Sequence, residues 1–303
     1  MNQSSTERVA RRALLIVNPA ARVAVRAQYH ATRAFAHQNV HCDVLTTDGP
    51  GHATELAREH ASRYDFVFTL GGDGTAMEVV TALAERGPPI GILPGGTGNV
   101  LVRALGIPLQ VANAVHALLN GREARIDLGR FQDGRHFAIG LGVGLDATMI
   151  AGASPLMKKR VGVLAYIWSA TKAALRLQHF HVRLTVDGQV YERRAAFVMI
   201  ANLGSVQLFG RVIHFGQGIL YDDGVLHAVI YSPANIWGAI RIFVRILFGR
   251  VHEDPATFYV SGREFRLETI PPRQAQADGE LLELTPIDIT VRPQAARILI
   301  PRE

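Results

Sequence analysis

Two glycine-rich segments lie close together in the first third of the chain, and each comes directly after a short apolar run. Gly71–Thr75 has the sequence GGDGT and follows Phe66–Leu70. Pro94–Asn99 has the sequence PGGTGN and follows Ile90–Leu93. Short apolar runs that end in glycine are typical of buried parallel strands, whose carboxyl ends meet at one edge of a sheet. We therefore expect both segments to lie at that edge.

Glycines at the carboxyl edge of a parallel sheet favour phosphate binding. They let backbone N–H groups approach a phosphate closely, and the N-terminus of a following helix adds positive potential. For one such segment, a tight turn with Thr75 as helix cap explains the glycines equally well. Two segments in the same context favour phosphate binding. The chain has no G-x-x-x-x-G-K-[ST] sequence, which excludes the P-loop NTPases.

Strand and helix patterns alternate around these segments, which predicts an α/β domain with a parallel sheet over residues 1–130. The predicted strands are 13–17, 40–45, 66–70, 90–93 and 125–128, and the predicted helices are 22–38, 52–62, 75–85 and 109–120. A last strand at about 292–303 is a candidate to return to this domain.

The pattern changes in the second half, where alternating runs and Asp-Gly turns predict a mainly antiparallel β-sandwich over residues 131–291. The predicted strands are 181–187, 189–201, 225–231, 257–260, 265–270, 281–284, 287–291 and 297–300, with helices at about 156–177 and 236–248. Gly140–Gly144 lacks the spacing of a dinucleotide-binding fingerprint, so we interpret its glycines as sites of close backbone packing at the domain junction.

The composition of the chain excludes several classes of protein and of site. With 48% hydrophobic and 19% charged residues, the chain is globular. Cys42 is the only cysteine, which excludes an internal disulfide and a cysteine zinc site and favours a cytoplasmic location. No run approaches the roughly 18 apolar residues of a membrane span. The net charge of +6 suits anionic ligands, but no basic helix or aromatic–basic sheet face is evident, so we expect no nucleic-acid partner.

The motifs, taken in order, resemble the diacylglycerol kinase catalytic domain of bacterial lipid kinases, which is shared with sphingosine and ceramide kinases. The motifs that carry the resemblance are Asn18-Pro19, Gly71–Thr75, Pro94–Asn99, Asp127–Gly129, Gly142–Asp146, Asp222–Leu226 and Asp278–Glu280. The resemblance implies an NAD-kinase-like nucleotide-binding domain and a lipid-substrate β domain, with ATP in a cleft between them. It also implies a lipid kinase that uses Mg²⁺ to transfer the γ-phosphoryl of ATP to the hydroxyl of diacylglycerol or a related lipid. Such an enzyme is cytoplasmic and peripherally membrane-associated, and a homodimer is one assembly open to it.

The resemblance assigns roles to individual residues. It implies that Glu280 is the general base and that Asp73 and Asp127 organise the catalytic Mg²⁺. A second, structural Mg²⁺ would take the Asp223 carboxylate and the carbonyls of Leu220 and Val225. The residues implied to line the ATP site are Asn18, Thr46, Gly71, Gly72, Asp73, Gly74, Thr75, Ala76, Met77, Gly96, Thr97 and Asn99, with Thr47 as the alternative to Thr46.

The chain departs from the family pattern at three places. Ala20–Arg22 replaces a small polar residue and a glycine, Met77 stands where an Asn is frequent, and Val100 stands where an Asp is frequent. Each change removes a polar contact. Two alternatives therefore remain: an NAD kinase-like phosphotransferase, and a non-catalytic nucleotide- or lipid-binding regulator on the same fold.

Two segments are candidates for membrane contact. One is Lys158–Arg160 with the apolar run after it. The other is the predicted helix at 236–248, an amphipathic helix that can lie on a membrane or pack on its own core. Its apolar face would carry Ile236, Ile240, Phe243, Val244 and Leu247, with Arg241 and Arg245 on the opposite side and with Trp237 and Phe248 in the core or a pocket wall.

Overall fold

The structure is a computed structural model that describes residues 11–21, 24–144, 178–208, 211–214 and 218–302. The chain divides into two compact units. The first contains Met1–Arg125 and Ala296–Glu303, and the second contains Ile126–Ala295. The predicted helix at 156–177, the segment Lys158–Arg160 and the last two residues of Gly142–Asp146 lie outside the described residues.

The first unit is an α/β domain with a parallel sheet, as predicted. Its strands are β1 (Arg11–Val17), β2 (Val40–Thr46), β3 (Phe66–Gly71) and β4 (Ile90–Pro94), in the order β2-β1-β3-β4. The last residues of β18 (Ile287–Ile300) pair parallel to β4. The centre of β1 is completely buried, which explains its unbroken apolar run.

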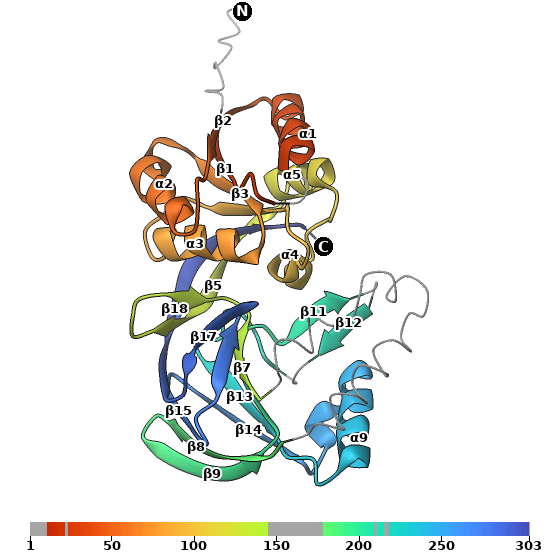
Figure 1. Cartoon of the computed structure of the whole chain (residues 1–303). Coiled ribbons are helices and arrows are strands. Elements are labelled where there is room, and N and C mark those ends of the chain that lie inside the picture. The colour runs from red at the N-terminus through yellow and green to blue at the C-terminus, as the bar shows by residue number, and fades with distance from the viewer. Residues whose placement is uncertain (1–10, 22–23, 145–177, 209–210, 215–217, 303) are drawn as a thin grey trace, which may run out of the picture. The chain divides into compact units, whose positions relative to one another are not determined.

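Five α-helices are described in this unit. They are α1 (Ala24–His37), α2 (His52–His60), α3 (Asp73–Leu83), α4 (Val100–Ala104) and α5 (Val111–Leu119), with a short 3₁₀ turn at Ala61–Arg63. Helix α1 packs against α5, and α2 packs against α3 (Figure 1). The short helix α4 was not predicted, because its five residues are too few to show a helical period.

The second unit is an antiparallel β-sandwich, as predicted. One sheet has the order β14-β13-β10-β7-β16-β17, and the facing layer contains the first part of β18 followed by β15, β8 and β9. Apolar side chains from both layers form one core. The bounds are β7 (Gly140–Val143), β8 (Phe180–Val186), β9 (Gln189–Ala195), β10 (Phe197–Ala201), β13 (Leu226–Tyr231), β14 (Thr257–Gly262), β15 (Glu264–Ile270), β16 (Gln274–Ala277) and β17 (Glu280–Leu284).

Smaller elements complete the second unit. Helix α9 (Ile236–Leu247) precedes a 3₁₀ turn at Val251–Glu253, and β11 (Ser205–Leu208) pairs with β12 (Arg211–His214). Strand β5 (Arg122–Phe131) begins in the first unit and ends in the second, where it pairs with β6 (His136–Phe137). The glycines at 140–144 allow close packing: a Cβ at Gly144 would lie 2.4 Å from the carbonyl oxygen of Ala196.

Two strand predictions were wrong. The single strand predicted over 189–201 is two strands, β9 and β10, which belong to different sheets. The chain changes sheet at Ala196, whose N–H donates to Tyr231 at 2.9 Å. Conversely, the two strands predicted at 287–291 and 297–300 are one strand, β18.

The helix predicted at 236–248 agrees in extent with α9, and the structure shows which contacts hold it to the protein, a point that the sequence left open. Arg241 and Arg245 form ion pairs with Asp254, whose side chain is fully buried. Trp237 lines a groove, and Phe248 is exposed and does not lie in the core.

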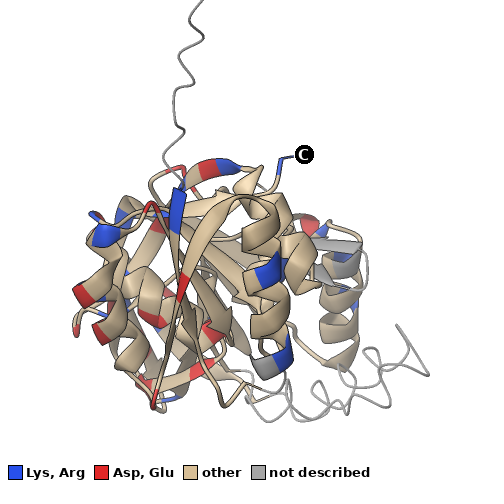
Figure 2. Ribbon diagram, turned by 90° about the horizontal axis from the view of Figure 1, so that it is seen from above, with Lys and Arg blue, Asp and Glu red and all other residues tan. Residues whose placement is uncertain are grey.

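No helix in the described part of the chain is both long and apolar enough to span a membrane. Basic and acidic positions are interspersed along the described ribbon (Figure 2).

Candidate active site

The two glycine-rich segments touch each other, as the sequence predicts. They follow neighbouring parallel strands, with Gly71 opposite Pro94 in the register of β3 and β4. The N–H of Gly95 donates to the carbonyl of Gly71 at 3.0 Å. A Cβ at Gly95 would lie 2.7 Å from the backbone nitrogen of Gly71, and one at Gly96 would lie 2.7 Å from Cα of Gly72. Glycine is required because the two loops pack backbone against backbone.

The end of β1 joins the same cluster through Asn18. Its backbone N–H donates to Leu70 at 3.0 Å, and its side-chain Nδ2 donates to Oγ1 of Thr75 at 3.1 Å. Its Oδ1 accepts the N–H of Ala20 at 3.0 Å. Helix α3 begins at Asp73 after the N-cap residue Gly72, so Thr75 lies inside the helix and is not its cap.

Asp73 and Asn99 connect the two loops to the helices that follow them. Oδ1 of Asp73 accepts the N–H of Leu101 at 3.1 Å, which fixes the start of α4. Asn99 has a left-handed backbone with φ of 48°, and its side chain exchanges two hydrogen bonds of 2.9 Å with the backbone of Gly96. Thr97, between them, is exposed. This edge of the sheet therefore offers backbone groups, the exposed hydroxyl of Thr97, the buried hydroxyl of Thr75 and the half-buried carboxylate of Asp73.

Other predicted ATP-site residues have less to offer through their side chains. Ala76 and Met77 are buried in α3. Thr46 is exposed at the end of β2, whereas Thr47 is buried and its N–H donates to Val17 at 2.9 Å, next to Asn18. The first loop at Ala20–Arg22 is described only as far as residue 21.

Glu78 is a structural residue of this cluster that the sequence did not reveal. Its carboxylate accepts the N–H of Gly51 at 2.9 Å and of Ala53 at 3.1 Å, so it holds the N-terminus of α2 against α3. A lone glutamate within a helix gives no sequence signal for such a partner.

In the second unit, Glu280 is exposed at the start of β17. The turn before it is tight, with φ of 48° at Asp278 and 93° at Gly279. The Asp278 carboxylate accepts the backbone N–H groups of Ala138, Ile139 and Gly140 at 2.6, 2.9 and 3.0 Å. Asp278 therefore fixes the turn that presents the Glu280 carboxylate. The Asp-Gly pair in the sequence signals the turn but not this contact.

Asp127 is fully buried in the second unit. Its Oδ2 accepts the N–H of Gly224 at 2.6 Å, and its Oδ1 accepts that of Gln294 at 2.7 Å. Burial raises the pKa of Asp127, although these two hydrogen bonds oppose the rise. Both carboxylate oxygens of Asp127 thus accept hydrogen bonds from the backbone. Through these bonds, Asp127 fixes the Asp222–Val225 turn and strand β18.

The predicted ligands of a structural metal lie around that same turn. Asp223 accepts the N–H of Val225 at 3.2 Å through Oδ1, and its Oδ2 lies 2.9 Å from Nε2 of His227. Leu220 is exposed. No group of three or more His, Cys, Asp or Glu side chains in the described residues is placed to bind a metal ion. One carboxylate with two carbonyls would still suit Mg²⁺, which takes oxygen ligands and retains several waters.

The comparisons with known proteins agree with this architecture. Residues 12–131 match the diacylglycerol kinase catalytic domain, and residues 140–300 match the YegS C-terminal NAD kinase beta sandwich-like domain. A diacylglycerol kinase of Bacillus subtilis is 26% identical over 299 residues, which cover 97% of this chain and 97% of that protein. A diacylglycerol kinase of Staphylococcus epidermidis is 26% identical over 85% of this chain and 81% of that protein.

Solved structures extend the similarity to the fold. The crystal structure of a diacylglycerol kinase from Bacillus anthracis covers 96% of this chain and 97% of its own, with a TM-score of 0.77 and 28% sequence identity. Both domains of the chain are therefore accounted for in the expected order. The chain belongs to the diacylglycerol kinase catalytic-domain family of bacterial lipid kinases.

Proposed function

We propose that this protein transfers the γ-phosphoryl group of ATP to the hydroxyl of diacylglycerol or a related lipid, with Mg²⁺. The observation that carries the proposal is the backbone-to-backbone contact of two glycine loops at the carboxyl ends of β3 and β4. Loops that lack side chains, next to the N-terminus of α3, suit the closely spaced negative charges of a triphosphate. The named relatives support diacylglycerol as the first acceptor to test.

Asp73 is the residue of this edge that suits a metal. Its Oδ1 is bonded to the N–H of Leu101, which leaves Oδ2 as a hard oxygen ligand of the kind that Mg²⁺ prefers. When bound, Mg²⁺ would offset negative charge on the transferring phosphoryl group. Asp73 would hold it, and the glycine loops with Asn18, Thr75 and Thr97 would bind the nucleotide.

Glu280 is proposed as the general base. A lipid hydroxyl is a poor nucleophile, and a carboxylate within hydrogen-bond reach can accept its proton as the new P–O bond forms. Glu280 is exposed on a turn that Asp278 fixes, so its carboxylate is accessible while its backbone is held. We assign Asp127 a supporting role, because its carboxylate orders the turn that carries Asp223, the proposed ligand of a second Mg²⁺.

The acceptor also sets the place of action. Diacylglycerol resides in a bilayer, so we propose that the protein works in the cytoplasm at the membrane surface, as a peripheral enzyme.

The test is lipid phosphate formation from labelled ATP over acceptors that include diacylglycerol, phosphatidylglycerol, sphingosine, ceramide and NAD. We expect one lipid acceptor to be phosphorylated, and Glu280→Gln and Asp73→Asn to lower that rate by at least about a hundredfold. Glu283→Gln is the matched control, because Glu283 is an exposed glutamate on the same strand.

Three outcomes would contradict the proposal. Equal activity of Glu280→Gln and wild type would show that Glu280 is not the general base. Phosphorylation of NAD alone would make the chain an NAD kinase-like phosphotransferase. ATP binding without turnover on any acceptor would favour a non-catalytic nucleotide- or lipid-binding regulator. The buried Met77 and the valine at position 100, which depart from the family pattern, are the reason for this alternative.

A further inference from the structure

Helix α9 carries large apolar side chains on its solvent side. Trp237 is 74% exposed, Phe248 at the C-cap is 71% exposed, and Val244 is 39% exposed. At about 100° per residue, these three positions fall within about 40° of one another around the helix axis. They form one apolar stripe along the helix.

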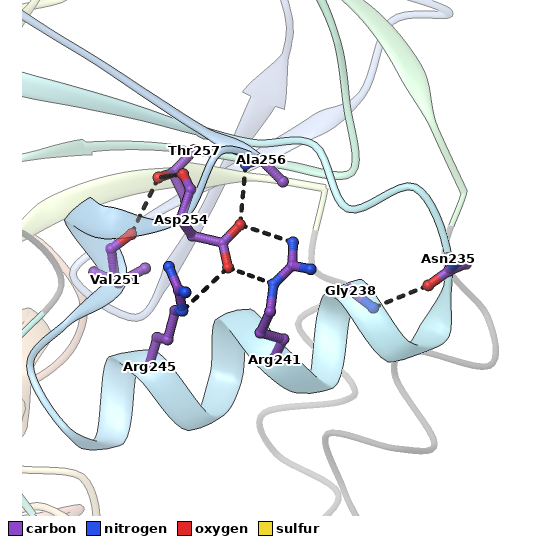
Figure 3. A network of polar contacts seen from close by, with 8 residues as sticks. All are labelled: Asn235, Gly238, Arg241, Arg245, Val251, Asp254, Ala256 and Thr257. Atoms are coloured by element: carbon purple, nitrogen blue, oxygen red, sulfur yellow. Dashed lines mark hydrogen bonds and ion pairs between the residues drawn. The ribbon is translucent and has the colours of Figure 1, made fainter.

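Contacts beside the stripe, through Arg241 and Arg245, and on the far side of the helix, through Ile242, hold α9 to its own unit. Arg241 donates to Asp254 through Nε at 2.7 Å and Nη2 at 3.0 Å, and Nε of Arg245 lies 3.5 Å from the same carboxylate (Figure 3). Ile242 is buried in a small core with Val251. The side of the helix that binds the protein is thus defined by these contacts, and the stripe is not needed for them.

A groove of about 670 Å³ adjoins the first turns of α9. The charged residues that line it are Arg193 and Arg241, and Trp237 lines it too. None of its described lining residues is acidic. The Arg193 guanidinium lies over the ring of Phe258 at 4.8 Å, and its Nη1 donates to the backbone carbonyl of Glu192 at 3.5 Å, so neither of these two partners neutralises its charge.

The charge of this surface is therefore positive. The buried Asp254 carboxylate contacts two arginines, so that group carries a net charge of 2 − 1 = +1. Arg193 adds a further positive charge beside it. Together, the apolar stripe and this groove make the surface that we call the α9 face: Trp237, Val244, Phe248, Arg193 and Arg241.

We infer that the α9 face docks on an anionic phospholipid bilayer. Tryptophan favours the interfacial layer of a membrane, and an apolar helix face flanked by arginine is the usual form of a helix that lies in that layer. Arginines beside the stripe complement the phosphates of anionic lipids. A second copy of the chain fits less well, because a symmetric contact through this face would bring the two arginine-lined grooves together.

This inference rests on the proposed action at a membrane surface, and its test uses no nucleotide. Sucrose-loaded vesicles of phosphatidylcholine, with or without phosphatidylglycerol, are sedimented with the full chain. We expect binding only with phosphatidylglycerol, weakened at least about tenfold by the double substitution Trp237→Ala, Phe248→Ala. Arg193→Gln should weaken it about fivefold, and Arg193→Lys should restore it.

The chain offers matched controls in its first unit. Tyr29→Ala removes an aromatic side chain that is 57% exposed, and Arg58→Gln removes an exposed arginine. Both should leave vesicle binding unchanged. Thermal unfolding of every variant separates a loss of docking from a loss of fold. In a Trp168→Phe background, Trp237 is the only tryptophan, and its emission should shift to the blue on anionic vesicles.

The outcomes separate docking from catalysis. Unchanged sedimentation of the Trp237, Phe248 double variant would overturn the docking inference, as would a shift of that variant from dimer to monomer with vesicle binding retained. Phosphorylation of a detergent-dispersed acceptor should be the same for wild type and the double variant. If no acceptor is phosphorylated but vesicle binding still depends on Trp237, the proposed function fails and the docking stands.

Discussion

The Asp278 carboxylate accepts three backbone N–H groups and lies two residues before Glu280. We predict that Asp278→Asn lowers kcat for lipid phosphorylation between about tenfold and a hundredfold, because a small displacement of a reacting group is costly. An amide has one acceptor oxygen in place of two, so at least one of these hydrogen bonds is lost. The KM for ATP should hardly change. Steady-state kinetics check both numbers, and a variant with wild-type kcat would show that the turn does not need this carboxylate.

Gly95 tests the contact between the glycine loops. An alanine there would place Cβ against the backbone nitrogen and oxygen of Gly71, at 2.7 and 2.9 Å. Backbone cannot move aside as a side chain can, so we predict that Gly95→Ala lowers the free energy of unfolding by about 2 kcal/mol. Gly49→Ala is the control, because a Cβ at Gly49 meets nothing within 4 Å. Urea unfolding measures both variants, and equal stability of the two would refute the argument.

The residues of the site differed in how far they could be predicted. The glycine loops and the Asp278–Glu280 turn could be recognised in the sequence because each is a short contiguous motif. The partners of Asp127 were not, because Gly224 and Gln294 are separated from it by 97 and 167 positions. The partners of Glu78 could not be predicted for the same reason, because they lie 25 and 27 positions away from it in the sequence. A buried carboxylate that binds distant backbone leaves no local pattern.

At the scale of elements, α9 is held to its unit by a buried carboxylate. Burial pushes the pKa of Asp254 upward, but the hydrogen bonds from Arg241 and Ala256 and the charges of Arg241 and Arg245 outweigh burial, so the net pKa is lowered. A carboxyl whose pKa is lowered by folding stabilises the fold above its unfolded pKa of about 3.9. That stabilisation disappears as the pH falls through the folded pKa.

We therefore predict that Asp254→Asn lowers the free energy of unfolding by about 2 kcal/mol at pH 7, since it leaves two arginines without their partner. The difference from wild type should shrink below about pH 4, where the wild-type carboxyl is also protonated. Urea unfolding between pH 3 and 7 measures this difference. The control is Glu283→Gln, at an exposed position, whose effect on the free energy of unfolding should not change with pH. A difference that stays the same at low pH would mean that the ion pairs contribute nothing.

Strand boundaries were predicted less well than strand positions, for a physical reason that β18 illustrates. Pro293 and the polar residues beside it look like the end of a strand in the sequence, yet β18 continues through them. Gln294 has φ of 51°, and its N–H donates to the buried carboxylate of Asp127. The backbone N–H of Gln294, at this irregular position, thus has its hydrogen-bond partner on the distant strand β5. The change of sheet at Ala196 depends in the same way on the carbonyl of Tyr231.

At the scale of the whole molecule, the first unit is built from both ends of the described chain. Ile298 pairs with Ile90 of β4, and it is completely buried. Arg297 donates to both carboxylate oxygens of Glu123, at 2.6 and 2.8 Å, and this contact lowers the pKa of Glu123. The parallel sheet is therefore complete only after the last residues have been added.

This arrangement predicts that truncation after Ala295 unfolds the first unit while the second keeps its fold. The truncation removes the buried side chains of Ile298, Leu299 and Ile300, which contribute about 1.5–3 kcal/mol each, against a typical domain stability of about 5–15 kcal/mol. Limited proteolysis with mass spectrometry should show rapid cleavage within residues 11–125 and protected fragments from 178–208 and 218–295. Truncation after Pro301 is the control and should leave both units protected. Equal protection of the first unit in the two truncations would show that β4 tolerates an open edge, and that the last strand is dispensable for folding.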